Sequence, residues 1–460
     1  MTKLEKTIED FFLNYREILG KHDTAAVNKI RNRAFQSFQK GGFINELQKD
    51  WKTKKLKEFS GNYYHSHFAS PAYFPGNQYF YECDIPDLKA YKITVYNGRT
   101  YTKDGHLTVL DNGIVYGSLS AAMKHYPAIV DRYFNASEKE HRDPVANVNT
   151  ALFRDGVFIY IPGNIKETPV IQVSNRFEGK VPSLFHIRNL IVTGENTALK
   201  LIFCSDAGDA NRYFTTLVNE VFLEENAKID WFDYQNINNR SALIQRSGFQ
   251  LSRQAELNVV SLGINGGLIR NFTQVDLNGK QGRATVNGLT LTDRDQHAGN
   301  QVFVAHNVPD CVSSQNFKSI LDDRSKVFFR GHILVSRDAQ RTKAFQNNAN
   351  ILLTDKAAVD TQPFLEIYAD DVSCSHGATA GQLNEEALFY LRTRGIQAQD
   401  AKLLQLFAFT SAVLNEINIP SLKDRTEDIV KKRLRGEADY CDKCILQCKN
   451  PAPPADPFLV

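Results

Sequence analysis

The first sixty residues place apolar side chains at the spacing of amphipathic helices. In TIEDFFLNYREIL, the side chains of Ile8, Phe11 and Phe12 fall on one side of a helix. AAVNKIRNRAFQSFQ continues this spacing until the glycine pair at residues 41–42 breaks it. Further on, short strand-like runs such as KITVYNGRTY alternate with one more helical stretch, LSAAMKHYPAIVDRYF. We therefore predict a helical and mixed region over residues 1–148.

The pattern changes over residues 149–380, where short runs rich in Val, Ile, Phe and Thr alternate with Gly, Asn and Asp turns. GVFIYIPGN and PVIQVSN are examples. Small residues follow polar turns at nearly constant spacing, at Ala198, Ala227, Ala255 and Gly282, and further turns fall at Ala339, Ala357 and Ser373. A tight solenoid corner accepts only a small side chain, so the repeat favours a β-helix. A β-sandwich with regular turns stays open as the alternative.

Helical spacing returns over residues 381–440. LNEEALFYLRTRG has Asn384 as an N-cap and Gly395 as a stop signal. The next helix, QAQDAKLLQLFAFTSAVLNEI, is apolar on two sides. It is either the centre of a three-helix bundle or a docking surface for another protein. The residues predicted to bind that partner are Leu403, Leu406, Phe407, Phe409 and Val413. Residues 441–460 form a tail rich in Cys and Pro.

Composition narrows the class of protein. The chain has 55 Lys and Arg against 52 Asp and Glu, and this balance does not indicate a nucleic-acid or membrane-surface protein. No run of about 18 apolar residues occurs, and the start lacks the apolar segment of a secretory signal. Seven cysteines, mostly isolated, fit a reducing compartment. We expect a cytoplasmic protein.

The stretch YADDVSCSHGATAG concentrates reactive side chains. If it continues a strand, the adjacent Asp370 and Asp371 point to opposite faces and cannot act as an acid/base pair. Cys374 and His376 share a face, and both are ligands for soft or borderline metals. Two ligands do not complete a site, so a metal there needs further ligands from a partner or substrate. Two alternatives to metal binding stay open: Cys374 and His376 act as a nucleophile and its base, or both have only a structural role.

The tail motif CDKCILQC places Cys441, Cys444 and Cys448 close enough to reach one metal, although no fourth ligand follows. Reduced thiols without a metal are the alternative. His306 with Cys311, and His65 with His67, are interpreted as structural. The sequence has no phosphate-binding loop, dinucleotide-binding glycine motif, nucleophile elbow or zinc-protease helix. We therefore expect no enzymatic activity.

The segment LEIYADDVSCSHGATAGQLNEEALFYLRTRGI, residues 365–396, closely resembles the SufD signature of the SufB/SufD family of iron–sulfur cluster assembly. ILDDRSKVFFRGHILVSRDAQRTKAFQNNANILLTDKAAVDTQP and DGVFIYIPGN resemble the same family. The resemblance implies a right-handed parallel β-helix between helical ends. It also implies a paralogous SufB partner paired through the β-helices, and a SufC ATPase docked on the C-terminal helices.

In the family, the position that matches His376 lies at the subunit interface near a SufB cysteine that holds a nascent cluster. This chain has no cysteine between Phe345 and Pro363, where SufB carries that residue, so it is SufD-like. The tail cysteines fall outside the pattern of this family.

The combined prediction is a non-enzymatic scaffold subunit that works with SufB and SufC. His376 and Cys374 contribute to a transient iron–sulfur cluster at the subunit interface, and no cofactor is bound permanently. Alone, the chain could form a homodimer. The alternative is a carbohydrate-active β-helix enzyme, a polysaccharide lyase or hydrolase. The cluster type, a role for flavin and metal binding by the tail stay open.

Overall fold

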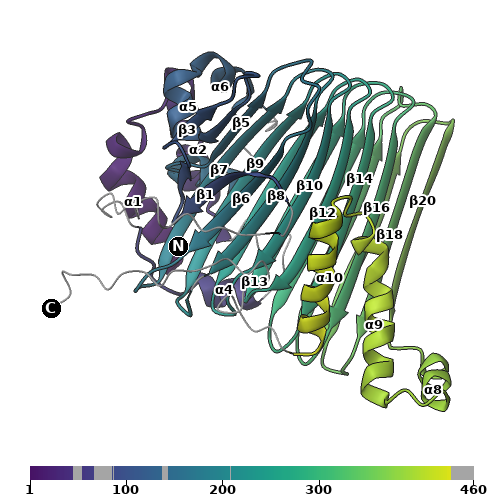
Figure 1. The fold of residues 1–460 in the computed structure, drawn as a ribbon. Coiled ribbons are helices and arrows are strands. Elements are labelled where there is room, and N and C mark those ends of the chain that lie inside the picture. The colour runs from purple at the N-terminus through teal and green to yellow at the C-terminus, as the bar shows by residue number, and fades with distance from the viewer. Residues whose placement is uncertain (45–53, 67–84, 86–87, 137–142, 208, 437–460) are drawn as a thin grey trace.

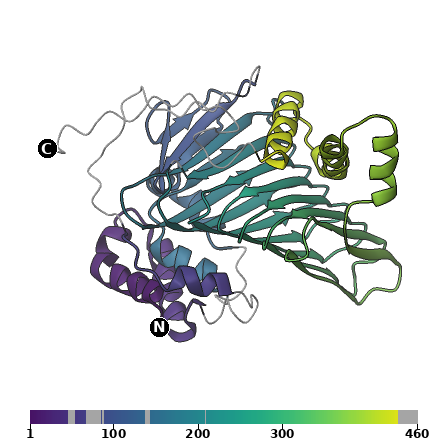
Figure 2. The same cartoon turned by 90° about the horizontal axis from the view of Figure 1, so that it is seen from below.

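The computed structural model describes residues 1–44, 54–66, 85, 88–136, 143–207 and 209–436. Its centre is a parallel β-solenoid built from two ten-stranded sheets (Figure 1). From β5 onward the chain alternates between the sheets, so each of these strands pairs in parallel with the strand two positions further along. Helices flank the solenoid on both sides (Figure 2). The prediction of a mainly β protein with a parallel β-helix core is confirmed.

The first sheet consists, in spatial order, of β2 (Arg99–Thr102), β1 (Tyr91–Tyr96), β6 (Val170–Phe177), β8 (Ala198–Ala207), β10 (Lys228–Asn236), β12 (Glu256–Asn265), β14 (Arg283–Thr292), β16 (Val312–Leu321), β18 (Thr342–Leu352) and β20 (Val372–Gly381). The second sheet consists of β19 (Ala358–Ile367), β17 (Lys326–Val335), β15 (His297–His306), β13 (Leu268–Leu277), β11 (Ala242–Leu251), β9 (Tyr213–Leu223), β7 (Ser183–Thr193), β5 (Val157–Ile161), β4 (Val115–Ser118) and β3 (Leu107–Val109). Strands β1 to β4 lie within residues 1–148, so both sheets begin before residue 149.

The corners between the sheets explain the repeat seen in the sequence. Asn226 and Gln254 adopt positive φ angles of 56° and 57°, and a buried alanine, Ala227 or Ala255, follows each of them. A larger side chain would not fit this corner. The prediction for Ala198 is wrong by one residue, because Ala198 pairs with Lys228 and begins β8.

Two further predicted turns are confirmed and one is not. Ala339 and Ala357 are buried and lie outside the strands, as corners of the solenoid require. Ser373 instead lies inside β20 and is exposed.

The interior of the solenoid is filled by side chains from both sheets. Trp231 of β10 stacks on Phe203 of β8, with ring centroids 4.4 Å apart, and meets Phe249 of β11 edge-on at 5.4 Å. These contacts join the two sheets through one apolar core. Each aromatic pair adds to the stabilisation from burial alone.

The N-terminal helices cover the outer face of the second sheet. They are α1 (Lys3–Leu19), α2 (Ala25–Gly41), α4 (Lys54–Ser60), α5 (Leu119–His125), α6 (Pro127–Tyr133) and α7 (Pro144–Leu152). Apolar side chains such as Ile8 and Phe35 pack with Phe214 and Ile244 of the sheet. Arg31 is buried, pairs with Asp23 at 2.7 Å and donates to three carbonyls around the end of α7.

The three C-terminal helices lie on the side of the molecule opposite the N-terminal helices (Figure 2). They are α8 (Glu385–Thr393), α9 (Ala398–Leu414) and α10 (Pro420–Leu434). The second and third of them pack on the outer face of the first sheet, and the first packs against the second. The Asn384 side chain accepts a hydrogen bond from the Ala387 amide, which confirms the predicted N-cap. Gly395 follows this helix with a φ of +85°, as expected of a stop signal. No helix in the described ranges is long and apolar enough to cross a membrane.

The two ends of the solenoid differ. At one end the sheets continue into the antiparallel pairs β1–β2 and β3–β4. At the other end, β19 pairs only with β17 and β20 only with β18 among the described residues. The last coil therefore presents open strand edges, with backbone groups free to pair with another chain.

Candidate functional site

The candidate site lies on β20, the last strand of the first sheet. Cys374 is half-buried and packs against a small apolar cluster that includes Ile333 of β17 and Ala344 of β18. This contact places Cys374 on the inner face of the sheet, toward the second sheet. His376, two residues further along the same strand, shares that face and is exposed. The prediction that Cys374 and His376 share one face of a strand is confirmed. This face lies at the end of the solenoid where no further described strand pairs with β20.

The two side chains do not form a complete metal site. Among the described residues, no group of three or more His, Cys, Asp or Glu side chains is arranged to hold a metal ion. Structural zinc sites in proteins use four ligands. Any metal bound at His376 and Cys374 therefore needs ligands from outside the described chain.

The chemistry of Cys374 does not fit a nucleophile. Burial raises the pKa of its thiol, although a hydrogen bond with the backbone of Ala344 partly offsets this effect. A thiol with a raised pKa is protonated at neutral pH and is a poor nucleophile. Within the described part of the chain no hydrogen bond joins it to His376, so the pair lacks the contact that activates a catalytic cysteine.

Asp370 and Asp371 do not lie on a strand. β19 ends at Ile367 and β20 begins at Val372, so both aspartates occupy the turn between them and are exposed. The expectation of one continuous strand is therefore wrong, because the solenoid corner falls at this point. The conclusion that these carboxylates do not form an acid/base pair stays a prediction.

The other histidines near this end are engaged elsewhere. His332 of β17 lies on the outer face, where its Nε2 is 2.9 Å from a carboxylate oxygen of Glu366. His306 is fully buried, with its Nε2 2.8 Å from the hydroxyl of Ser313. Cys311 is fully buried, and its thiol donates to the carbonyl of Gly279. The structural interpretation of His306 and Cys311 fits these contacts.

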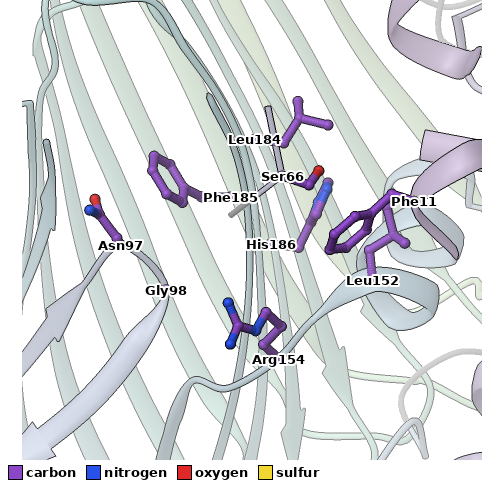
Figure 3. Close-up of a pocket in the computed structure, with 9 residues that line it drawn as sticks. All are labelled: Phe11, Ser66, Asn97, Gly98, Leu152, Arg154, Leu184, Phe185 and His186. Carbon is purple, nitrogen blue, oxygen red and sulfur yellow. The ribbon is translucent and has the colours of Figure 1, made fainter. Parts of the chain in front are cut away.

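A small pocket lies at the other end, between the N-terminal helices and β7 (Figure 3). It encloses about 30 Å³, and its lining includes Phe11, Ser66, Arg154 and His186. This volume has room for about two water molecules. Pockets that bind cofactors are roughly ten times larger or more. The pocket is too small to enclose a cofactor in this conformation.

His186 beside this pocket makes stability depend on pH. Burial lowers the pKa of its imidazole to about 3, while the unfolded chain has the ordinary value near 6.5. Below pH 6.5 the unfolded state binds a proton that the folded state does not, so stability falls as the pH drops toward 3. Between pH 6.5 and pH 5, this proton should lower the free energy of unfolding of the unchanged protein by about 1.6 kcal/mol. We expect His186→Gln to lack this part of the loss. Urea unfolding at several pH values measures this difference, and equal losses in both proteins would contradict it.

The predicted docking residues on α9 divide into two groups. Leu406 and Val413 are only 2% and 0% exposed, because they pack within the chain's own core against the first sheet and α10. They offer no surface to a partner in this conformation, in contrast to the prediction. Leu403, Phe407 and Phe409 are half-buried. The two apolar sides of this helix indicated burial by a helix bundle or by a partner, whereas the structure covers one side with the first sheet.

The exposed apolar side chains of this region lie mainly on α8. Phe389 is 70% exposed, Tyr390 is 56% exposed, and Leu404 of α9 is 50% exposed. We call these three residues the C-terminal apolar patch. The prediction did not include them, although the adjacent Phe and Tyr in EEALFYLRT offered a signal. Large apolar side chains gathered on a surface mark interaction sites. Cys441, Cys444 and Cys448 lie outside the described residues.

Comparison with known proteins identifies the family. Residues 175–409 match the family model described as SUF system FeS cluster assembly, SufBD core domain. Residues 2–173 match the model of the SufBD protein N-terminal region. The chain therefore belongs to the SufB/SufD family.

The curated relatives carry the same family names. An iron-sulfur cluster assembly SufBD family protein of Synechocystis is 27% identical over 358 residues, which cover 76% of this chain and 79% of that protein. The iron-sulfur cluster assembly protein SufD of Escherichia coli is 29% identical over 269 residues, 58% of this chain and 64% of that protein. SufD of Bacillus subtilis is 24% identical over 338 residues, 71% of this chain and 75% of that protein. The carbohydrate-enzyme alternative finds no support among these relatives.

Proposed function

We propose that this chain is a SufD-type scaffold subunit of iron–sulfur cluster assembly, with no enzymatic activity of its own, acting in the cytoplasm. The observation that carries the proposal is the position of Cys374 and His376. They lie on the inner face of the last strand, where the solenoid is open. An incomplete ligand pair at an open subunit end is suited to a cluster completed by another chain.

The open edges of β19 and β20 support pairing with a SufB-type paralogue. Unpaired strand edges bind other strands through backbone hydrogen bonds. Strand β20 is built mostly from small residues, VSCSHGATAG, so a partner strand can approach closely. In such a complex the partner's thiolates or carboxylates lie next to His376 and supply the missing ligands. A second copy of this chain could occupy the same edges, which would give a homodimer.

The C-terminal apolar patch supports docking of a SufC-type ATPase. Phe389 and Tyr390 project from α8, while α9 beside it is anchored to the first sheet by Leu406 and Val413. A partner that binds α8 is therefore connected mechanically to the solenoid. The ATPase would supply the ATP hydrolysis for which this chain has no motif, and its movement would reshape the interface.

The cluster is cargo in this proposal, held briefly and then passed on. Imidazole nitrogen and thiolate sulfur are both known ligands of iron in iron–sulfur proteins. Because each subunit supplies only a few ligands, the cluster is released more easily than it would be from a closed site of four cysteines. The thiol of Cys374 must lose its proton to bind iron, and its raised pKa increases the cost of that deprotonation.

The composition of the complex tests this function. The chain is expressed under anaerobic conditions alone and together with its SufB-type and SufC-type partners, and iron and acid-labile sulfide are measured per complex. We expect stoichiometric iron and sulfide only when the partners are present. Equal cluster content in the isolated chain, or cleavage of uronate polymers by it, would contradict the proposal.

A further inference from the structure

The interior of the solenoid changes character toward its open end. One inward-facing row crosses the first sheet in register from β10 to β20. Its members in order are Trp231, Val259, Val286, Gln315, Gln346 and His376. The first three are apolar and belong to the solenoid core. The last three are polar, so the row becomes polar only in the coils that lead to the candidate site.

The two glutamines of this row are buried without hydrogen bonds. Gln315 is 1% exposed and Gln346 is 4% exposed. Neither the nitrogen nor the oxygen of either carboxamide has a hydrogen-bond partner within the described ranges. A buried amide without partners costs free energy, and folded proteins rarely keep one without a reason. The nearby Asn348 shows the usual case, since its amide donates to the Phe317 carbonyl and accepts from Thr361.

The opposite sheet leaves space for the Gln346 carboxamide. Gly331 lies on β17, and a Cβ atom at this position would lie 2.4 Å from Nε2 of Gln346. The glutamine side chain therefore crosses the interior from the first sheet and ends against the backbone of the second. Gln346 pairs in register with His376, and neighbouring strands lie about 4.8 Å apart. The carboxamide is thus one strand away from the candidate ligand.

We infer that Gln346 is a positioning residue whose carboxamide donates hydrogen bonds to inorganic sulfide of the nascent cluster at His376, with Gln315 lining the same wall one coil deeper. This inference rests on the proposed function. A carboxamide offers two N–H donors and carries no charge. Hydrogen bonds to the sulfurs of an iron–sulfur cluster change its reduction potential and help to hold it. Free hydrosulfide has the same acceptor chemistry, but only cluster sulfide requires iron.

The test uses the complex with its partners, loaded with cluster under anaerobic conditions. Gln346→Leu keeps the volume of the side chain and removes both donors. We expect an unchanged or higher melting temperature, because no protein hydrogen bond is lost. We also expect loss of the cluster to an iron chelator to become about 10-fold faster, and the reduction potential to fall. Gln315→Leu, one coil deeper, is the matched control and should change both quantities less.

A second variant keeps the test valid if Gln346→Leu does not fold correctly. Gly331→Ala keeps the glutamine but forces its carboxamide to move, and it should accelerate cluster loss in the same direction. The inference is wrong if Gln346→Leu and Gly331→Ala both match the unchanged complex in the rate of cluster loss to the chelator and in reduction potential. The proposed function still stands in that case, provided that His376→Ala loses the cluster. If His376→Ala retains the cluster, the proposed function itself fails. If labelled hydrosulfide binds equally with and without iron, the ligand is free sulfide and the inference is overturned.

Discussion

His376→Ala is expected to lower the iron and sulfide content of the complex by on the order of 10-fold or more. The imidazole is exposed on the inner face of β20 at the open end of the solenoid, and its removal leaves Cys374 as the single proposed ligand on this strand. Because the side chain is exposed, its removal should leave the melting temperature unchanged. Iron and acid-labile sulfide assays after anaerobic assembly measure the effect.

The matched control is Ser375→Ala on the same strand. Ser375 is also exposed but points to the opposite face of β20. We expect this variant to assemble clusters normally. Cys374→Ser should give an intermediate loss, because the thiol is half-buried and protonated. A His376→Ala complex with normal cluster yield would remove the ligand role.

The second large effect concerns the ATPase. Replacing both Phe389 and Tyr390 with alanine is expected to weaken ATPase binding by about 30-fold or more, which corresponds to roughly 2 kcal/mol or more for the loss of central aromatic contacts. Both side chains are largely exposed, so the fold of α8 should survive. Titration calorimetry with the purified ATPase measures the dissociation constant, and circular dichroism measures helix content and melting temperature.

Leu13→Ala is the control for the docking prediction. Leu13 of α1 is 60% exposed and lies among the N-terminal helices, away from α8. Its replacement should leave the ATPase dissociation constant unchanged. Equal binding by the double variant and the unchanged chain would show that the ATPase does not use the C-terminal apolar patch.

Local signals in the sequence were sufficient for much of the fold. The small residues at 227 and 255 follow polar turn residues, and a corner that accepts only a small side chain depends on these few neighbours. The cap at Asn384 and the shared face of Cys374 and His376 are equally local. Spacing of two residues on one strand is enough to predict that shared face.

The features that sequence reasoning missed depend on residues far apart in the chain. Leu406 and Val413 are buried because the first sheet lies under α9, and helical periodicity does not contain this contact. Gln346 was not recognised because its environment comes from Gly331 on the opposite sheet and from the register with His376. The turn at Asp370 and Asp371 was missed because strand-forming residues flank the acidic pair on both sides, and the point where β19 ends depends on the length of each coil.

The central claim is that His376 supplies one ligand to a cluster that another subunit completes. Labelling only this chain with ¹⁵N-histidine, assembling it with unlabelled partners and recording pulsed electron paramagnetic resonance of the reduced cluster tests the claim directly. The account predicts a ¹⁵N hyperfine coupling from a coordinated imidazole that disappears in His376→Ala. A normal cluster signal without nitrogen coupling from the labelled chain would contradict it.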